Sequence, residues 1–236
     1  MRRIACLALI LGLALSGCVE VTQPAPPPRP APQQAAPREP TRASMAQFTA
    51  VTRRVEPVAE RTCRARAPRA NCDFRIMVDD RPGQQINAYQ TLDRTGRPVI
   101  VFTLPMIAAV RNDDELAFVM GHEAAHHIAG HIPRQQQSAA AGALILGGLT
   151  ALTGAGQSAV DSAVDIGAGL GGRAFSKEFE LEADALGTVI THRAGHDPVR
   201  GAAFFSRIPD PGDRFLGTHP PNAQRFEVVR RTAARL

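Results

Sequence analysis

The stretch His122-Glu123-Ala124-Ala125-His126 governs the interpretation of the whole chain. Residues four apart lie one turn apart on the same face of a helix, so the two imidazoles can reach one metal ion. Glu123 projects beside them and can take a proton from a water bound to that ion. The pattern predicts a hydrolytic zinc site, and two surface histidines with an unrelated glutamate are the structural alternative.

The sequence around this stretch predicts that it lies inside a helix. Asn112, with Glu115 three residues later, resembles a capping box, which marks the start of a helix. Apolar residues then recur at helical spacing and predict a core-facing stripe made of Leu116, Met120, Ala124 and Ile128. We expect this helix to run from Asn112 to about His131.

A catalytic zinc ion normally takes a third protein ligand and keeps one position for water. A third histidine at the spacing His-x-x-Gly-x-x-His does not follow His126, so a later helix is expected to supply the ligand. The candidate segment is Glu180-Leu181-Glu182-Ala183-Asp184. Glu180 is favoured over Glu182, because Asp184 lies one turn after Glu180 and can accept a hydrogen bond from a ligand imidazole. Glu182 is then expected to be a flanking surface charge.

The remaining sequence predicts one mostly helical domain, residues 44–236, with a small sheet. Phe74, Ile76 and Val78 alternate as in a half-buried strand, and two further strands flank a turn-rich segment. The expected strands are 73–79, 85–92 and 99–103, and the expected helices besides the first one described are 44–66, 175–193, one starting at Asp197-Pro198 and one starting at Asn222. The fold class is therefore α+β, mostly α.

Residues 135–160 carry no charge and are rich in alanine and glycine. The large apolar residues among them are few and include Leu144, Ile145, Leu146 and Leu149. This composition favours a tightly packed helical hairpin or a mobile flap, with a membrane span as the alternative.

The N-terminus resembles a bacterial lipoprotein leader. Arg2 and Arg3 precede the apolar run Ile4 to Leu15, and Leu15-Ser16-Gly17-Cys18 resembles a lipobox, in which the cysteine is acylated and the chain is cut before it. We expect a signal peptide at 1–17 and a lipidated, proline-rich tether at 18–43. Ordinary secretion is the alternative. Val19, with no aspartate there, favours the periplasmic face of the outer membrane over the inner membrane.

Two cysteines remain in the expected domain, and the chain is modestly basic. Cys63 and Cys72 are an even pair in an oxidising compartment and are expected to form a disulfide, with separate thiols as the alternative. The net charge of +5 includes Arg2 and Arg3, which a signal peptidase would remove. An exported chain with this spread of arginines argues against nucleic acid as a partner and allows weak attraction to anionic surfaces.

Short motifs follow one another in a fixed order from Asn87 to Arg225. They are Asn87-Ala88-Tyr89, Asp114-Glu115-Leu116-Ala117, the stretch 122–126, His131, Ser176, the stretch 180–184, Ala194-Gly195-His196-Asp197-Pro198, and Thr218-His219-Pro220-Pro221 with Arg225. In this order they resemble the HtpX-like zinc metallopeptidases, the family that includes the CAAX prenyl proteases and the BepA and LoiP periplasmic proteases. The resemblance implies a gluzincin-like domain with one Zn²⁺ per chain.

The resemblance also implies roles for single residues. It makes Glu180 the third ligand, and it places His219 near the metal, where it steadies the transition state or caps the zinc at rest. A plain loop residue is the alternative for His219. Lys177 stands where an arginine is usual and His196 where a tyrosine is usual, which puts local packing in doubt.

These expectations together describe a zinc endopeptidase of the cell envelope, with Glu123 as general base. The strand at Asn87, Ala88 and Tyr89 is expected to hold an extended substrate by edge pairing, which favours unfolded segments. Misfolded or misassembled envelope proteins are the expected substrates. The alternatives are a non-proteolytic chaperone or assembly factor that retains the zinc site, and a different zinc hydrolase.

Overall fold

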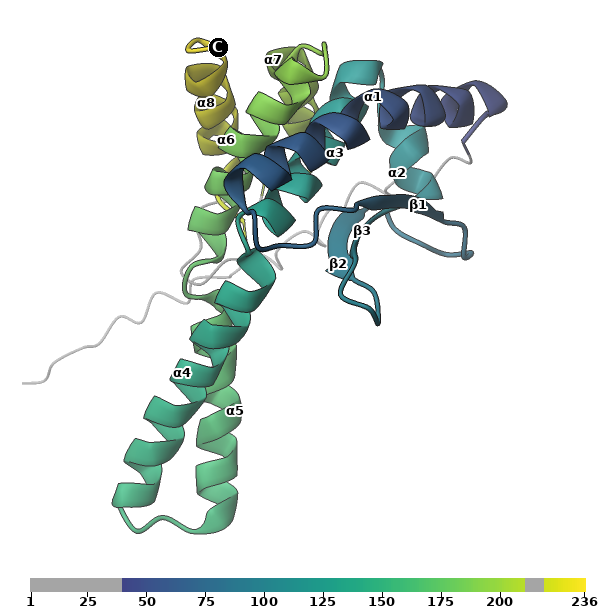
Figure 1. Ribbon diagram of the computed structural model, residues 1–236. Coiled ribbons are helices and arrows are strands. Elements are labelled where there is room, and N and C mark those ends of the chain that lie inside the picture. The colour runs from purple at the N-terminus through teal and green to yellow at the C-terminus, as the bar shows by residue number, and fades with distance from the viewer. Residues whose placement is uncertain (1–39, 211–218) are drawn as a thin grey trace, which may run out of the picture. The chain divides into compact units, whose positions relative to one another are not determined.

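The computed structural model describes residues 40–210 and 219–236 (Figure 1). The predicted signal peptide, Cys18 and all but the last few residues of the predicted tether lie outside the described residues. The described elements are α1 (Arg42–Arg66), β1 (Arg75–Asp79), β2 (Ala88–Leu92), β3 (Pro98–Thr103), α2 (Leu104–Ala109), α3 (Asp113–Ile128), α4 (His131–Leu152), α5 (Gln157–Arg173), α6 (Ser176–Arg193), α7 (Pro198–Ala202), a short 3₁₀ helix (Ala203–Arg207) and α8 (Asn222–Ala233). This confirms the mostly helical α+β fold.

The sheet has three strands in the order β1-β3-β2. β1 is parallel to β3 and β2 is antiparallel to it, with Ile76 opposite Ile100 and Tyr89 opposite Val101. The six residues of β3 are all buried, as expected of a central strand, whereas β2 is only half-buried and lies at an edge of the sheet. β2 also lies against α3, so this edge runs close to the helix that carries the two histidines.

The core lies between α1, the sheet, α3 and α6. All four residues of the predicted stripe on α3 are buried in it. The ring of Phe48 from α1 meets Phe102 of β3 edge to face, with ring centroids 5.3 Å apart. This packing fixes α3 on three sides and therefore fixes the backbone that carries His122 and His126.

Two glycines let α3 and α6 cross in backbone contact. A Cβ atom on Gly187 would come within 2.9 Å of the backbone N and Cα of His122. A Cβ on Gly121 would come within 2.9 Å of the Gly187 carbonyl oxygen. Real side chains do not tolerate such distances, so only glycine permits this approach. The close crossing brings Glu180, two turns before Gly187, within reach of the histidines.

The ends of α3 differ in detail from the expected ones. Asn112 caps the helix by accepting from the backbone N–H groups of Asp114 and Glu115, as predicted. The Glu115 carboxylate, however, accepts from the N–H of Arg111 rather than from that of the cap residue. The helix ends at Ile128 instead of near His131, because Gly130 adopts a left-handed conformation (φ 67°) that breaks it.

The glycine-rich segment forms a helical hairpin, α4 and α5, whose two helices lie side by side (Figure 1). Only His131, Gly147, Ala163 and Gly167 of its residues are buried. Among the described residues, no helix has the length and apolarity that a membrane span requires. Of the predicted alternatives for this segment, the structure has the helical hairpin.

A disulfide joins Cys63, near the end of α1, to Cys72, which precedes β1. Their Cα atoms are 5.6 Å apart, and both cysteines are buried in the core. The bond closes a short loop that ties the first helix to the first strand.

Candidate metal centre

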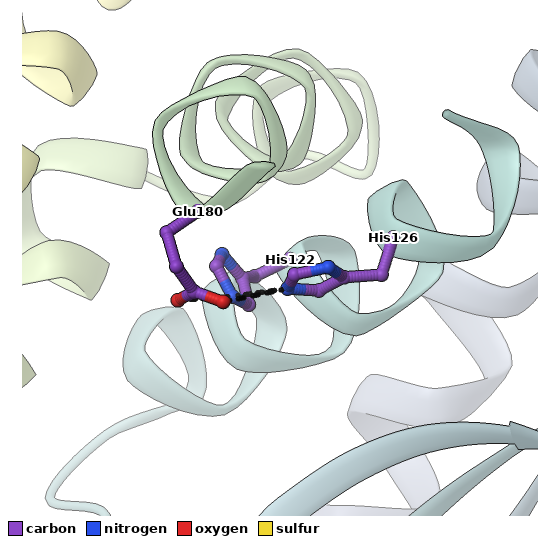
Figure 2. Close-up of side chains that lie close together, drawn as sticks. All are labelled: His122, His126 and Glu180. Atoms are coloured by element: carbon purple, nitrogen blue, oxygen red, sulfur yellow. Dashed lines mark hydrogen bonds and ion pairs between the residues drawn. The ribbon is translucent and has the colours of Figure 1, made fainter. Parts of the chain in front are cut away.

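Three side chains from two helices converge on one point (Figure 2). His122 and His126 come from α3, and Glu180 comes from α6. The two histidine Nε2 atoms are 3.0 Å apart, and the Glu180 carboxylate oxygens lie 3.6 Å from His122 Nε2 and 3.3 Å from His126 Nε2. A tetrahedral zinc ion with bonds of about 2.1 Å holds its donors about 3.4 Å apart, so this spacing fits zinc.

The first imidazole is oriented by a buried carboxylate. Asp184 is fully buried and its Oδ1 lies 2.9 Å from His122 Nδ1. An Nδ1–H that donates to this oxygen leaves the Nε2 lone pair directed at the shared point. Asp184 lies one turn after Glu180 on α6, which is the arrangement expected from the sequence.

An arginine from α8 holds this carboxylate in place. Arg225 is buried and donates to both oxygens of Asp184, from Nε at 2.8 Å and from a terminal nitrogen at 2.7 Å. The same terminal nitrogen lies 3.4 Å from a Glu180 oxygen, and the guanidinium stacks over the Phe205 ring. Arg225 therefore links the last helix of the chain to the carboxylates of α6.

The second imidazole is oriented through another histidine. His126 Nδ1 lies 2.8 Å from His131 Nδ1, and His131 Nε2 lies 3.2 Å from a Glu182 oxygen. Burial and the neighbouring His126 lower the pKa of His131 to about 4, so the ring is neutral and its Nδ1 can accept from His126. His131 also stacks on Phe179, with centroids 4.5 Å apart and planes 12° from parallel.

The electrostatics of the centre favour a cation. Burial opposes a charge on His122, but Asp184 and Glu180 outweigh it and raise the pKa of His122 to about 10. Burial likewise opposes the charge on Glu180, yet hydrogen bonds with His122 and His126 hold the pKa of Glu180 well below its usual value. The His122 imidazole therefore lies in a field that stabilises positive charge, and the donor set of two imidazoles and one carboxylate is one that zinc takes.

Two further predicted residues lie beside the centre. Glu123 follows His122 on α3 and is not one of the three converging donors. Burial raises its pKa, with His122 and His126 opposing, so its carboxylate is a stronger base than an exposed glutamate. His219 has a half-exposed side chain, and its Nε2 lies 3.8 Å from a Glu180 oxygen, so the residue is at the solvent-facing side of the centre.

Some residues lie away from the centre, and others contribute to it in ways that residue spacing does not indicate. Asn87 precedes the edge strand, Ala88 and Tyr89 begin it, and none of the three is among the converging donors. Glu182, expected to be a flanking surface charge, instead accepts from both His131 and Arg134.

Sequence reasoning missed the tautomer-fixing contact of His131 and the clamp that Arg225 forms on Asp184. Neither contact follows from a helical period, because each joins residues on different helices. The signal that could have found them is the placement of His131 and Arg225 among the ordered motifs.

A loss of His131 is expected to weaken the metal centre without removing a ligand. In His131→Ala, His126 loses the acceptor that fixes its tautomer, so zinc affinity should fall about 10- to 100-fold. Competition with a chromophoric chelator measures this. The matched control is His127→Ala, because the His127 ring contacts the Asn71 carbonyl at 2.7 Å rather than the centre. Equal zinc affinities in the two variants would contradict the role of His131.

The sequence also matches a known protein family over most of its length. A family model described as Peptidase family M48 matches residues 45–233. The chain belongs to peptidase family M48. The match spans His122, Glu123, His126 and Glu180, and it confirms the metallopeptidase family that the ordered motifs indicated.

The chain is also similar to a curated metalloendopeptidase. The chain is 30% identical over 147 residues to the mitochondrial metalloendopeptidase OMA1 of Saccharomyces cerevisiae. The match covers 56% of this chain but only 40% of the yeast protein. The aligned region therefore spans less than half of the length of that relative.

Proposed function

We propose that this M48 chain is a zinc-dependent endopeptidase of the bacterial cell envelope. The observation that carries the proposal is the convergence of His122 Nε2, His126 Nε2 and a Glu180 oxygen, all within 4.8 Å of one another, with Glu123 next to them. Each histidine has its Nδ1 engaged by another side chain, so both Nε2 atoms are available to a metal ion.

The residues of the centre divide the work of peptide hydrolysis between them. Zinc, when bound by His122, His126 and Glu180, supplies a Lewis acid that lowers the pKa of water. Glu123 accepts a proton from the attacking water and passes it to the nitrogen of the leaving amine. His219, on the solvent-facing side, donates a hydrogen bond to the carbonyl oxygen of the substrate as negative charge develops there.

The edge strand β2 is proposed to hold the substrate. It pairs with β3 on one side and lies against α3, which carries Glu123. An extended peptide that pairs with the other side of β2, near Asn87 and Tyr89, would run alongside that helix. Edge pairing requires an extended backbone, which supports unfolded or misassembled envelope proteins as substrates.

The envelope location is supported by two features of the chain. Leu15-Ser16-Gly17-Cys18 resembles a lipobox, and Cys63 and Cys72 form a disulfide, a bond that persists in oxidising compartments. We infer that Cys18 is acylated and that the domain faces the periplasm from the outer membrane.

Purified protein is expected to contain one zinc per chain and to cleave unfolded casein. Removal of zinc with a chelator should abolish cleavage, and stoichiometric zinc should restore it, because the donor set fits zinc. Metal analysis alongside a gel-based digestion measures both quantities. Zinc-loaded protein that leaves casein and other unfolded proteins intact, yet complements a deletion strain, would favour the chaperone or assembly-factor alternative.

Cys18→Ser is expected to move the protein from the membrane fraction to the soluble periplasmic fraction. The acyl chains are the anchor, since each buried methylene contributes about 0.8 kcal/mol to membrane affinity. Metabolic labelling with a radioactive fatty acid and fractionation measure the change. Fatty acid incorporation that persists in Cys18→Ser would exclude this cysteine as the lipidation site without bearing on the peptidase centre.

A further inference from the structure

The hairpin of α4 and α5 is held together by its smallest residues. A Cβ on Gly142 or on Gly167 would collide with the carbonyl of the other glycine, and a Cβ on Gly171 would collide with that of Ser138. The two helices therefore touch at backbone distance along these positions. The interface between α4 and α5 therefore has no room for large side chains at these positions.

The large apolar residues of the hairpin are consequently exposed. Leu152 is 85% exposed and Leu144 is 77% exposed, values that exclude a role in the core. The exposed set also includes Ile145, Leu149, Ile166 and Leu170. Single exposed apolar residues are normal on protein surfaces, but seven on one two-helix element, with Val164 as the seventh, require an explanation.

Four of these side chains, those of Ile145, Leu152, Ile166 and Leu170, lie on one face of the hairpin by the helical wheel, whereas Leu144 lies on the side of α4 that faces away from α5. The contact between Gly142 and Gly167 marks an approximate two-fold axis, since Ser138 and Gly171 pair at equal distances from it. Positions at equal offsets from the two glycines therefore lie on the same face of the pair. Ile145 and Leu170 both stand three residues after their glycine, and Ile166 and Leu152 fall beside them at 100° per residue.

The acidic residues of the hairpin lie away from this apolar face. Asp161 and Asp165 are the only charged residues in 135–172, and the helical wheel places both away from the apolar face. The helical wheel places Arg134 and Arg173 on the apolar side at the root of the hairpin, where the Arg134 guanidinium lies over the Phe179 ring of α6. Both arginines are exposed, and Arg134 also bonds to Glu182. The hairpin is thus an amphipathic pair with a basic border at one end.

We propose that this apolar face lies flat on a lipid bilayer, with Arg134 and Arg173 at the level of the phosphate groups. An amphipathic helix pair with one charged side lies in the plane of the interface instead of crossing it. The inference rests on the proposed envelope location, because acylated Cys18 would keep the bilayer near. The 21 residues between Cys18 and the first described residue reach about 65 Å when proline-rich and extended.

The basic border is the reason to favour lipid over a second copy of the chain. Anionic phosphates complement exposed arginines next to an apolar face. In a face-to-face pair of hairpins, the faces themselves would bring only aliphatic side chains and these arginines together. A bilayer therefore complements both parts of the face.

The test measures vesicle binding without the acyl anchor. Full-length protein carrying Cys18→Ser is mixed with vesicles of phosphatidylethanolamine and phosphatidylglycerol and separated by flotation. The face variant combines Ile145→Ser, Leu152→Ser, Ile166→Ser and Leu170→Ser. The matched control, Ala140→Ser with Ala151→Ser, changes exposed residues of α4 outside the apolar face. Helical content, zinc content and casein cleavage establish that both variants are folded.

The face variant should bind vesicles at least about tenfold more weakly, while the control binds like the parent. Equal binding by the parent and the face variant would overturn the proposal. So would a parent that does not bind vesicles and forms a dimer that the face variant abolishes, because the partner would then be a second copy. Vesicle binding requires no turnover, so failure here leaves the peptidase proposal intact, and loss of cleavage leaves this one intact.

Discussion

Glu123→Gln is expected to lower the rate of casein cleavage by about 10²- to 10⁴-fold and to leave zinc binding unchanged. General acid–base catalysis contributes about that factor, and a neutral amide cannot accept the proton of the attacking water. Zinc should remain because Glu123 is not among the three converging donors. Single-turnover cleavage assays and metal analysis of the same preparation measure the two effects separately.

The pattern of kinetic constants sharpens this test. Because Glu123 acts on the reacting atoms, kcat should fall while KM changes little. Glu123→Asp keeps the carboxylate but shortens its reach, so partial activity is expected of it. A Glu123→Gln enzyme within tenfold of wild type, still loaded with zinc, would show that another group moves the proton.

Glu180→Gln is expected to weaken zinc binding by more than about a hundredfold and to remove activity at ordinary zinc concentrations. Loss of an outer hydrogen bond already costs about 10- to 100-fold in metal affinity, and loss of a charged ligand should cost more. The substitution also removes a negative charge 3.4 Å from Arg225, so the remaining field favours a cation less. Isothermal titration of the metal-free protein with zinc measures the affinity.

The chain offers a matched control two residues earlier. Glu178→Gln makes the same chemical change on the same helix at an exposed position. Its zinc affinity and activity should equal those of wild type. If Glu180→Gln bound zinc as tightly as Glu178→Gln, the third ligand would have to be another residue, and Glu182→Gln would be the next variant to test.

The parts of the centre that depend on helical spacing were predictable from the sequence. His122 and His126 share a face because they are four apart, and Glu180 and Asp184 share a face for the same reason. The four residues of the predicted stripe on α3 are all buried, although the packing of α6 and α7 buries most of the other faces of that helix as well. Local periodicity determines these features, so the amino-acid sequence alone was enough to predict them.

The parts that depend on tertiary packing were not predictable from spacing. Arg225 is 41 residues from Asp184 in sequence, and no periodicity links them. In the sequence, Gly121 and Gly187 are two ordinary glycines within predicted helices. Only the packing of α3 against α6 shows that the two helices cross in backbone contact there. The left-handed Gly130 ends α3 early and makes His131 the first residue of a new helix, which is how its ring comes to face His126.

The position of the hairpin in the chain has a consequence for engineering. α4 and α5 form the connection between the helix that carries His122 and His126 and the helix that carries Glu180, yet they pack mainly on each other. The distal part of this insertion can therefore be shortened, lengthened or exchanged for another antiparallel helix pair without rebuilding the catalytic core. His131 and Arg134 set the limit of such a graft, because the first turn of α4 belongs to the metal centre.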